Sequence, residues 1–242
     1  MAEVLRIAVW SCPRTVSTAL LRSFAQRPDT TGVDEPLYAF YLKQTGRIHP
    51  MREEVLRAQA QDWRTVVKDV LLGPCPTPVQ FVKHMAHHLV GDADPSFAAG
   101  MRNVFLIRSP RQMLPSFHKD LGDLHRRDIG YEWQRDLYHN LRRRGHDPLV
   151  LDSSDLLANP AGMLSLLCSR LGLAFDRRML SWPLGRHACY GIWAPAWYKN
   201  VEASTEFLPL QEKTAPFPPD LEPMLAIAQE CYLDLHARRL RA

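Results

Sequence analysis

The stretch IAVWSCPRTVSTAL, residues 7–20, sets out the beginning of the fold. An apolar run typical of a buried strand ends at Pro13–Arg14, and a turn of small hydroxyl residues follows. Val16, Leu20 and Phe24 then recur at the spacing of one helix face. The stretch predicts a strand, a loop and a helix whose N-terminus could hold an anion. It contains neither G-x-x-x-x-G-K-[ST] nor GxGxxG, so an ordinary strand followed by a serine- or threonine-capped helix explains it equally well.

Short apolar runs that alternate with helical patterns continue along the chain. The runs predict strands at 5–10, 30–36, 79–85, 103–108 and 148–157. Helical spacing predicts helices at 16–26, 50–72, 111–127, 131–145, 160–172 and 219–240. Strands separated by helices indicate an α/β fold with a central parallel sheet of about five strands flanked by helices. The sequence shows no internal repeat and no low-complexity tract, so we expect residues 1–242 to form one domain.

The composition is that of an ordinary globular protein. Of 242 residues, 46% are hydrophobic, and the formal net charge is only +4, which argues against a nucleic-acid partner. No apolar run reaches the roughly 18 residues that a membrane span requires. The five cysteines are scattered, without CxxC or metal-ligand spacing, and an odd count without evident pairing is typical of a reducing compartment. We therefore expect a cytoplasmic protein without a nucleic-acid or membrane partner; its oligomeric state stays open, a homodimer included.

Chemically active side chains gather where the predicted strands end. Ligands of open α/β sheets bind outside the carboxyl ends of the strands, so these positions form the candidate site. They are Ser11–Thr18, Asp34–Glu35, Lys83–His88, Arg108–Arg111 and Asp152. Most of them carry groups suited to phosphate, proton or anion chemistry.

A second phosphate-binding pattern lies downstream of the first. In FLIRSPRQMLPSF, residues 105–117, Arg108 ends a strand and Ser116 lies in the next helix. Arg108 could grip a phosphate from the strand end while Ser116 donates a hydrogen bond from the helix. Taken singly, either residue is equally well a surface arginine or a helix serine. Together with the first stretch, they favour a phosphate-binding site over an ordinary strand and helix.

These segments together resemble the PAPS-dependent sulfotransferases, which use 3′-phosphoadenosine 5′-phosphosulfate as the sulfuryl donor. Residues 13–18, PRTVST, are similar to the family's P-K-x-G-T-T loop, and Arg108–Ser116 matches its R-x-P-x(5)-S element. Residues 151–176 resemble its strand–EDL–P–helix–LGL segment. A bacterial and fungal group of sulfotransferase-like proteins carries similar D-E-P-L-Y, K-H-M-x-H-H, W-A-P-x-W-Y and S-T-x-F segments, so the resemblance extends from about residue 7 to 207. It implies a three-layer P-loop-like fold, PAPS as co-substrate, a small-molecule acceptor and no metal.

The resemblance assigns the 5′-phosphosulfate to the first loop and the 3′-phosphate to the second pattern. The residues that it implies for binding the co-substrate are Arg14, Thr15, Val16, Ser17, Thr18, Arg108 and Ser116. Two departures from the family pattern matter. Arg14 replaces a lysine by a planar guanidinium, and Val16 replaces a glycine by a residue with restricted φ. Both changes affect transfer more than nucleotide binding.

Sulfuryl transfer needs a cation at the leaving phosphate and a base for the acceptor. Arg14 is the first candidate for the cation, and Lys83, at the end of the third predicted strand, is the second. For the base, the resemblance points to Glu35 first and to His87 next. We expect Arg14 and Lys83 to lower the pKa of Glu35 unless burial offsets them.

His84 and His88 flank His87 and are further candidates for the base. Their i, i+4 spacing matches HxxxH, but the glutamate of H-E-x-x-H and a third ligand are missing, so we expect no metal. The C-terminal segment, about 180–242, is aromatic-rich, and we expect it to cover the active site. Its rings either line an acceptor or adenine pocket or pack as a lid over a small core. The four that we single out are Trp182, Trp193, Trp197 and Tyr198.

Two other functions stay open at this stage. One is a PAP- or PAPS-type nucleotide-binding protein without transfer activity, which Arg14 and Val16 would allow. The other is a P-loop-related kinase. Two observations argue against the kinase. The sequence lacks the Walker lysine, and it has no clear Walker B acid at a strand end, with Asp152 as the one candidate.

Overall fold

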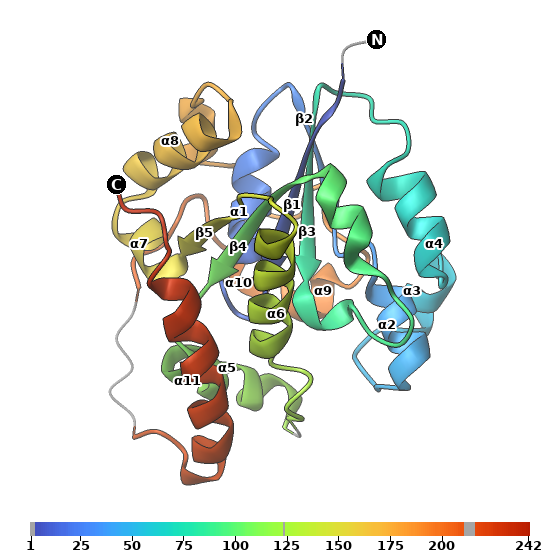
Figure 1. Cartoon of the computed structure of the whole chain (residues 1–242), viewed down its shortest axis with the longest axis vertical. Helices are drawn as coiled ribbons and strands as arrows, with labels where there is room; N and C mark the ends of the chain where they lie inside the picture. Colours follow the sequence, from blue (N-terminus) through green and yellow to red (C-terminus); the bar gives the residue numbers. More distant parts are fainter. Residues whose placement is uncertain (1–2, 123, 211–215) are drawn as a thin grey trace.

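The computed structural model describes residues 3–122, 124–210 and 216–242. Within these residues five strands form one sheet, and every neighbouring pair is parallel. The strands are β1 (Leu5–Ser11), β2 (Thr30–Asp34), β3 (Val79–Met85), β4 (Arg102–Ile107) and β5 (Leu149–Asp152). Their order is β2-β3-β1-β4-β5, so the first strand lies in the centre (Figure 1). The predicted α/β fold with a five-stranded parallel sheet is confirmed.

Helices cover both faces of the sheet and give the fold three layers. One face packs against α1 (Ser17–Phe24), α7 (Ser153–Ala158) and α8 (Pro160–Leu171). The other packs against α5 (Pro110–Leu121), α6 (Tyr131–Arg143) and α11 (Glu222–His236), and Figure 1 shows α6 in front of the strands with α11 beside it. The shorter elements are α2 (Tyr38–Thr45), α3 (Arg52–Ala58), α4 (Trp63–Val66), the π-helix η1 (Val67–Leu71), η2 (Ala86–His88), η3 (Pro95–Gly100), η4 (Arg177–Leu180), α9 (Ala194–Trp197), α10 (Lys199–Glu202) and η5 (Pro219–Leu221). In the described ranges none of the helices is both long and apolar enough to cross a membrane.

The central strands are apolar on both faces because both faces are covered. In β1, Ile7 and Val9 enter the core on the α1 side, while Ala8 and Trp10 enter the core on the α6 side. β3 and β4 are buried in the same way along nearly their whole length. This burial is what their near-continuous apolar sequences predict.

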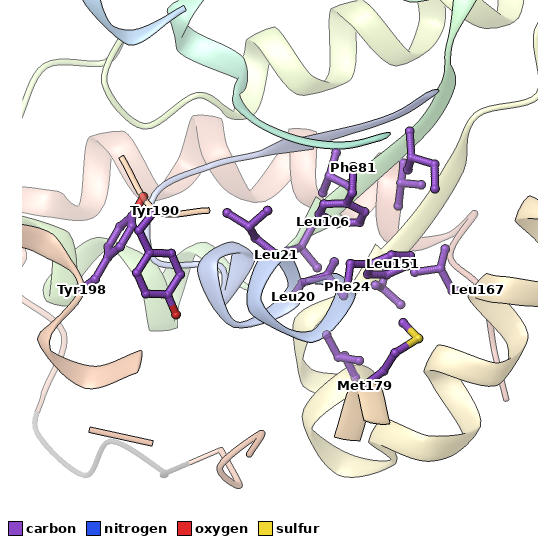
Figure 2. Close-up of a cluster of buried hydrophobic side chains, with 14 of the residues drawn as sticks. Leu20, Leu21, Phe24, Phe81, Leu106, Leu151, Leu167, Met179, Tyr190 and Tyr198 are labelled. Atoms are coloured by element: carbon purple, nitrogen blue, oxygen red, sulfur yellow. The ribbon is translucent and has the colours of Figure 1, made fainter. Parts of the chain in front are cut away.

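The helix α1, which follows the loop after β1, packs between the sheet and η4. Leu20, Leu21 and Phe24 project from α1 into the core, as Figure 2 shows. The Phe24 ring stacks on Phe81 of β3 with centroids 4.2 Å apart. Met179 of η4 lies in the same buried cluster, so α1 is covered on two sides. This packing fixes the N-terminus of α1 at the carboxyl edge of the sheet.

Two predicted elements are shorter than the apolar pattern suggested. The helix predicted at 50–72 is divided into α3, α4 and η1, because Gln59 is extended and Asp62 caps a new helix by accepting from the Thr65 N–H. The strand predicted at 148–157 ends at Asp152, whose carboxylate accepts from the Ser154 N–H and starts α7. In both places an acidic N-cap outweighs the apolar residues beyond it.

One helix prediction was wrong in extent, and one helix of eight residues was not predicted. The helix predicted at 111–127 ends at Leu121, because Gly122 follows with a φ of 74°. The helix α2 was not predicted. Its residues follow the acidic strand end of β2 directly and carry no N-cap signal in the sequence.

Buried neutral histidines should make this fold sensitive to acid. Burial lowers the pKa of His84 and His87 to about 3 and that of His49 to about 4. In the unfolded chain each takes up a proton below about pH 6.5, so the unfolded state gains stability as the pH falls from there towards about 4. We expect a loss of up to about 1.4 kcal/mol per histidine for each pH unit below 6.5. Urea unfolding near neutral pH and at about pH 5.5 measures this loss.

His84→Phe is the matched control for that prediction. The His84 ring stacks on Trp10 with centroids 4.2 Å apart, so a phenyl ring keeps the contact without the titration. The variant should show a smaller pH dependence than the natural protein. The raised pKa of Glu35 works in the opposite direction, but burial lowers the pKa of four histidines, His49, His84, His87 and His88. Equal free energies of unfolding at both pH values would contradict the prediction.

Candidate active site

The carboxyl ends of β1 to β4 meet at one cavity of about 520 Å³. This volume is in the range of small-molecule sites. The walls are the loop after β1, the residues that follow β2, β3 and β4, and part of the C-terminal segment. All the residues indicated for co-substrate binding and catalysis line it: Arg14, Thr15, Val16, Ser17, Thr18, Glu35, Lys83, His87, Arg108 and Ser116.

The loop between β1 and α1 has an unusual backbone. Arg14 and Val16 have φ of 59° and 60°, in the left-handed region that a β-branched residue rarely adopts. The Thr15 hydroxyl donates to the Cys12 carbonyl at 2.9 Å and closes the turn from inside. α1 then begins at Ser17 with no side-chain cap from the described residues, so the alternative of a serine- or threonine-capped helix is wrong. The first N–H groups of α1 are available to an anion, and strain of this kind gathers at functional sites.

The two segments for which the sequence predicts phosphate binding form one wall of the cavity. Arg108 Nη1 donates to the carbonyl of Arg14 at 2.6 Å, and Arg14 Nε donates to Ser116 Oγ at 3.4 Å. Arg14 also pairs with Asp120 of α5, with Nε 3.4 Å from Oδ2. The Tyr131 hydroxyl donates to the Arg108 carbonyl at 2.8 Å and fixes that strand end. The fold therefore brings Arg14, Arg108 and Ser116 into direct contact.

Lys83 is the centre of a buried polar cluster at the β2–β3 side of the cavity. Its side chain is 0% exposed, and Nζ lies 2.9 Å from Asp34 Oδ1, 2.5 Å from Glu35 Oε1 and 2.6 Å from Tyr198 Oη. An ammonium has three N–H donors, so these partners use all of them. The Tyr198 hydroxyl donates to Asp34 Oδ2 at 2.7 Å and accepts from Trp193 Nε1 at 2.9 Å. The cluster fixes the orientation of Glu35 at the cavity wall.

Burial controls the protonation of this cluster. Burial raises the pKa of Glu35, the charge of Lys83 lowers it, and the charge of Asp34 raises it. The net effect is a raised pKa. The sequence predicted that nearby cations would lower the pKa of Glu35 unless burial offset them. Burial does offset the effect of Lys83. For Lys83 burial acts downward, but Asp34 and Glu35 outweigh it and its pKa is raised. Lys83 stays protonated near neutral pH, while Glu35 accepts a proton more readily than an ordinary glutamate.

The three neighbouring histidines point to different places. His84 faces away from the cavity and stacks on Trp10, whereas His87 and His88 line the cavity. His88 Nε2 lies 3.9 Å from Glu35 Oε2, and burial lowers the pKa of both His87 and His88. His84 and His88 therefore do not share a face. No group of three or more His, Cys, Asp or Glu side chains within the described residues is placed to hold a metal ion.

Three of the four aromatic residues singled out in the C-terminal segment line the cavity. They are Trp193, Trp197 and Tyr198. The fourth, Trp182, lies in the core, edge-on to Phe207 with centroids 5.1 Å apart, and its Nε1 donates to the Ser204 carbonyl. The Gly191 N–H donates to Asp34 Oδ2 at 3.0 Å and ties the segment to the end of β2.

Sequence reasoning did not foresee that Asp34 and Tyr198 are partners of Lys83. For Asp34 a partial signal was present, because the sequence already placed it with Lys83 among the strand ends. In the register of β2 and β3, Asp34 is the direct partner of Lys83, so the two side chains leave the sheet on the same side. Tyr198 offered no such signal, because it approaches from a distant segment whose path no local pattern predicts. Tyr38 and His49 also line the cavity and were not singled out.

The chain belongs to the sulfotransferase domain family, whose model matches residues 5–238. The resemblance to sulfotransferases is thereby confirmed. Two curated proteins of Arabidopsis thaliana, branched-chain-amino-acid aminotransferase-like proteins 1 and 2, are 38% and 37% identical to it over 218 and 214 residues. These matches cover 90% and 88% of this chain but 39% and 38% of the relatives, so the chain spans about two-fifths of their length.

Solved sulfotransferase structures share the fold. The sulfotransferase domain from the curacin biosynthetic pathway has a TM-score of 0.56 at 16% identity, covering 95% of this chain and 99% of that one. The sulfotransferase domain from the olefin synthase of Synechococcus PCC 7002 has a TM-score of 0.55 at 17% identity, covering 94% and 95%. A sulfotransferase from Alicyclobacillus acidocaldarius gives 0.52 at 14% identity, covering 100% and 98%. At these identities the likeness concerns the fold.

Proposed function

We propose that the protein transfers a sulfuryl group from PAPS to a hydroxyl or amine of a small-molecule acceptor. One observation carries the proposal: an uncapped helix N-terminus beside two arginines shares a cavity with a buried carboxylate that a lysine holds in place. The helix N-terminus and the two arginines suit a polyanionic donor. The carboxylate and its lysine suit removal of a proton from an acceptor. Membership of the sulfotransferase family supports the pairing. The five free cysteines support a reducing compartment such as the cytoplasm.

The donor is proposed to bind at the β1–β4 side of the cavity. Its 5′-phosphosulfate would take the first N–H groups of α1 with the Ser17 and Thr18 hydroxyls, and its 3′-phosphate would take Arg108 and Ser116. Arg14 now contacts Ser116. Binding therefore requires the Arg14 guanidinium to exchange that contact for the donor.

The chemistry divides between the two sides of the cavity. The acceptor atom forms a bond to sulfur as the S–O bond to the phosphate breaks, and the bonding pair leaves with the phosphate. Arg14 neutralises the leaving phosphate, and Glu35 takes the acceptor proton. Lys83 orients Glu35 and adds a second cation near the reacting atoms. His87 ranks below Glu35 as the base, because burial lowers its pKa to about 3.

A second candidate function is nucleotide binding without transfer. The contacts of Arg14 with Ser116 and Asp120 favour it, since they hold the guanidinium on α5. The kinase alternative has less support. Asp152, its one candidate acid, accepts from the Ser154 N–H at 2.7 Å and from the Tyr232 hydroxyl at 2.9 Å, so both carboxylate oxygens already have protein partners.

Thermal unfolding with nucleotides separates these functions, because a ligand of the folded state raises Tm. Adenosine 3′,5′-bisphosphate should raise Tm more than AMP or ATP with magnesium. A shift with ATP–magnesium and none with the bisphosphate would refute the proposal. Transfer of labelled sulfate from PAPS to a pool of metabolites then tests catalysis, and binding without transfer would establish the second candidate.

Arg108→Ala should weaken the bisphosphate far more than AMP. Loss of a charged hydrogen-bonding partner costs about 1.5–3 kcal/mol, or roughly 10- to 150-fold in Kd. Isothermal titration of both nucleotides measures the difference. Arg111→Ala is the control, since Arg111 lies three residues on, stacks over Phe217 at 4.9 Å and is not among the cavity residues. Equal losses for both nucleotides would remove the 3′-phosphate role from Arg108.

A further inference from the structure

The strand order distributes charge unevenly along the cavity. From β2 through β3 and β1 to β4, the strand ends contribute in turn Asp34 and Glu35, Lys83, Arg14 and Arg108. On the β2 side, two carboxylates hold one ammonium, which leaves an excess of one negative charge. On the β4 side, the guanidiniums of Arg14 and Arg108 and the N-terminus of α1 line the cavity, whereas their acidic neighbours Asp120 and Asp152 do not. Besides Glu35, the carboxylate that lines the cavity among the described residues is Glu206 of the C-terminal segment. The donor side is thus electropositive, and on the β2 side the ammonium is already paired.

The remaining titratable groups on the β2 side do not change this balance. Burial lowers the pKa of all three histidines that line the cavity, His49, His87 and His88, so they are neutral near pH 7. Burial raises the pKa of Tyr38 and Tyr198, so both phenols are neutral as well. Among the described lining residues, the cationic side chains are Arg14, Lys83 and Arg108. A carboxylate on the acceptor would lose its water there without gaining a cation.

Aromatic rings wall the same side. Tyr38 meets Trp193 edge-on with centroids 5.1 Å apart, and Trp197 meets His49 edge-on at 5.9 Å. All four rings line the cavity. Aromatic faces attract cations by about 0.5–2 kcal/mol each and repel anions. The excess negative charge and the aromatic rings on the β2 side therefore both favour a cationic ligand.

We infer that the acceptor is cationic: an alcohol or amine that also carries an ammonium group, with carboxylated and phosphorylated acceptors rejected. The inference rests on the proposed function, since it names the acceptor class of that site. The ammonium lies among the rings of Tyr38, Trp193 and Trp197. The reacting hydroxyl or amine reaches Glu35 Oε2, the oxygen that Lys83 does not hold.

Three phenols of matched shape test the inference. Tyramine, para-ethylphenol and para-hydroxyphenylacetate share a ring and a hydroxyl but are cationic, neutral and anionic. We expect Kd to increase in that order, with tyramine about tenfold or more tighter than the anion. Isothermal titration is run with and without adenosine 3′,5′-bisphosphate. Glu35→Gln should reduce the ratio between the Kd of para-hydroxyphenylacetate and that of tyramine. Glu54→Gln, an exposed change on α3, should leave this ratio unchanged.

Equal affinities for the three phenols, or tighter binding of the anion, would overturn the inference. Trp197→Leu gives a second variant outside the ion cluster, and it should weaken tyramine more than para-ethylphenol. The failure of the proposed function is seen separately. If the bisphosphate does not bind, the donor assignment fails, while the charge preference is still read from the titrations without nucleotide.

Discussion

Glu35→Gln should lower kcat by about 10²- to 10⁴-fold, the usual contribution of a general base. The amide keeps an oxygen for the 2.5 Å contact with Lys83 but cannot take a proton. Affinity for adenosine 3′,5′-bisphosphate should be nearly unchanged, because Glu35 lies on the other side of the cavity from Arg108. Steady-state kinetics with labelled PAPS, together with bisphosphate titration, measure both quantities. Glu54→Gln on α3 is the matched surface control.

The pH profile adds a second test of the same assignment. A base must be ionised, so activity should be lost as the pH falls through the pKa of Glu35. Burial raises that pKa above its ordinary 4.5, so the acid limb of kcat should lie above that value. In Glu35→Gln the limb should disappear. Full activity in Glu35→Gln together with a loss in His87→Asn would move the base to His87.

Lys83→Met should lower the free energy of unfolding by about 3–5 kcal/mol, since it leaves two buried carboxylates without their cation. Lys83 is wholly buried, and Asp34 and Glu35 are nearly so. Urea unfolding followed by circular dichroism measures the loss. Lys43→Met, on the exposed side of α2, should change the free energy of unfolding by less than about 0.5 kcal/mol.

A double variant tests whether the charge itself is responsible. Adding Asp34→Asn to Lys83→Met removes one of the two buried carboxylate charges that have lost their cation. The double variant should therefore lose less free energy of unfolding than the two single variants lose in sum. Strict additivity would mean that Lys83 stabilises the fold through packing of its stem alone.

The sheet could be predicted because its strands are buried on both faces. Apolar runs such as 79–85 and 103–108 have few alternatives once helices separate them. The breaks at Asp62 and Asp152 were harder to foresee, because each depends on one carboxylate meeting an N–H two or three residues away. An apolar pattern contains no information on that contact.

The candidate site was predictable to the extent that it follows the strand ends. Arg14, Glu35 and Lys83 were placed by the rule that ligands bind at the carboxyl edge. The contact between Arg14 and Ser116, and the role of Tyr198, were not predictable, because they depend on where a helix and a distant segment settle over the sheet. Such contacts are set by packing of the whole chain.

The attachment of the C-terminal segment to Asp34 has a consequence for turnover. Asp34 accepts from the Gly191 N–H and the Tyr198 hydroxyl on one oxygen and holds Lys83 on the other. Swinging this segment outward would break the hydrogen bonds of Gly191 and Tyr198 and the packing that keeps Lys83 wholly buried. Substrates and products should therefore come and go while the segment stays docked, through the open side of the cavity. Exchange of the Gly191 amide hydrogen should then be as slow as that of the central strands.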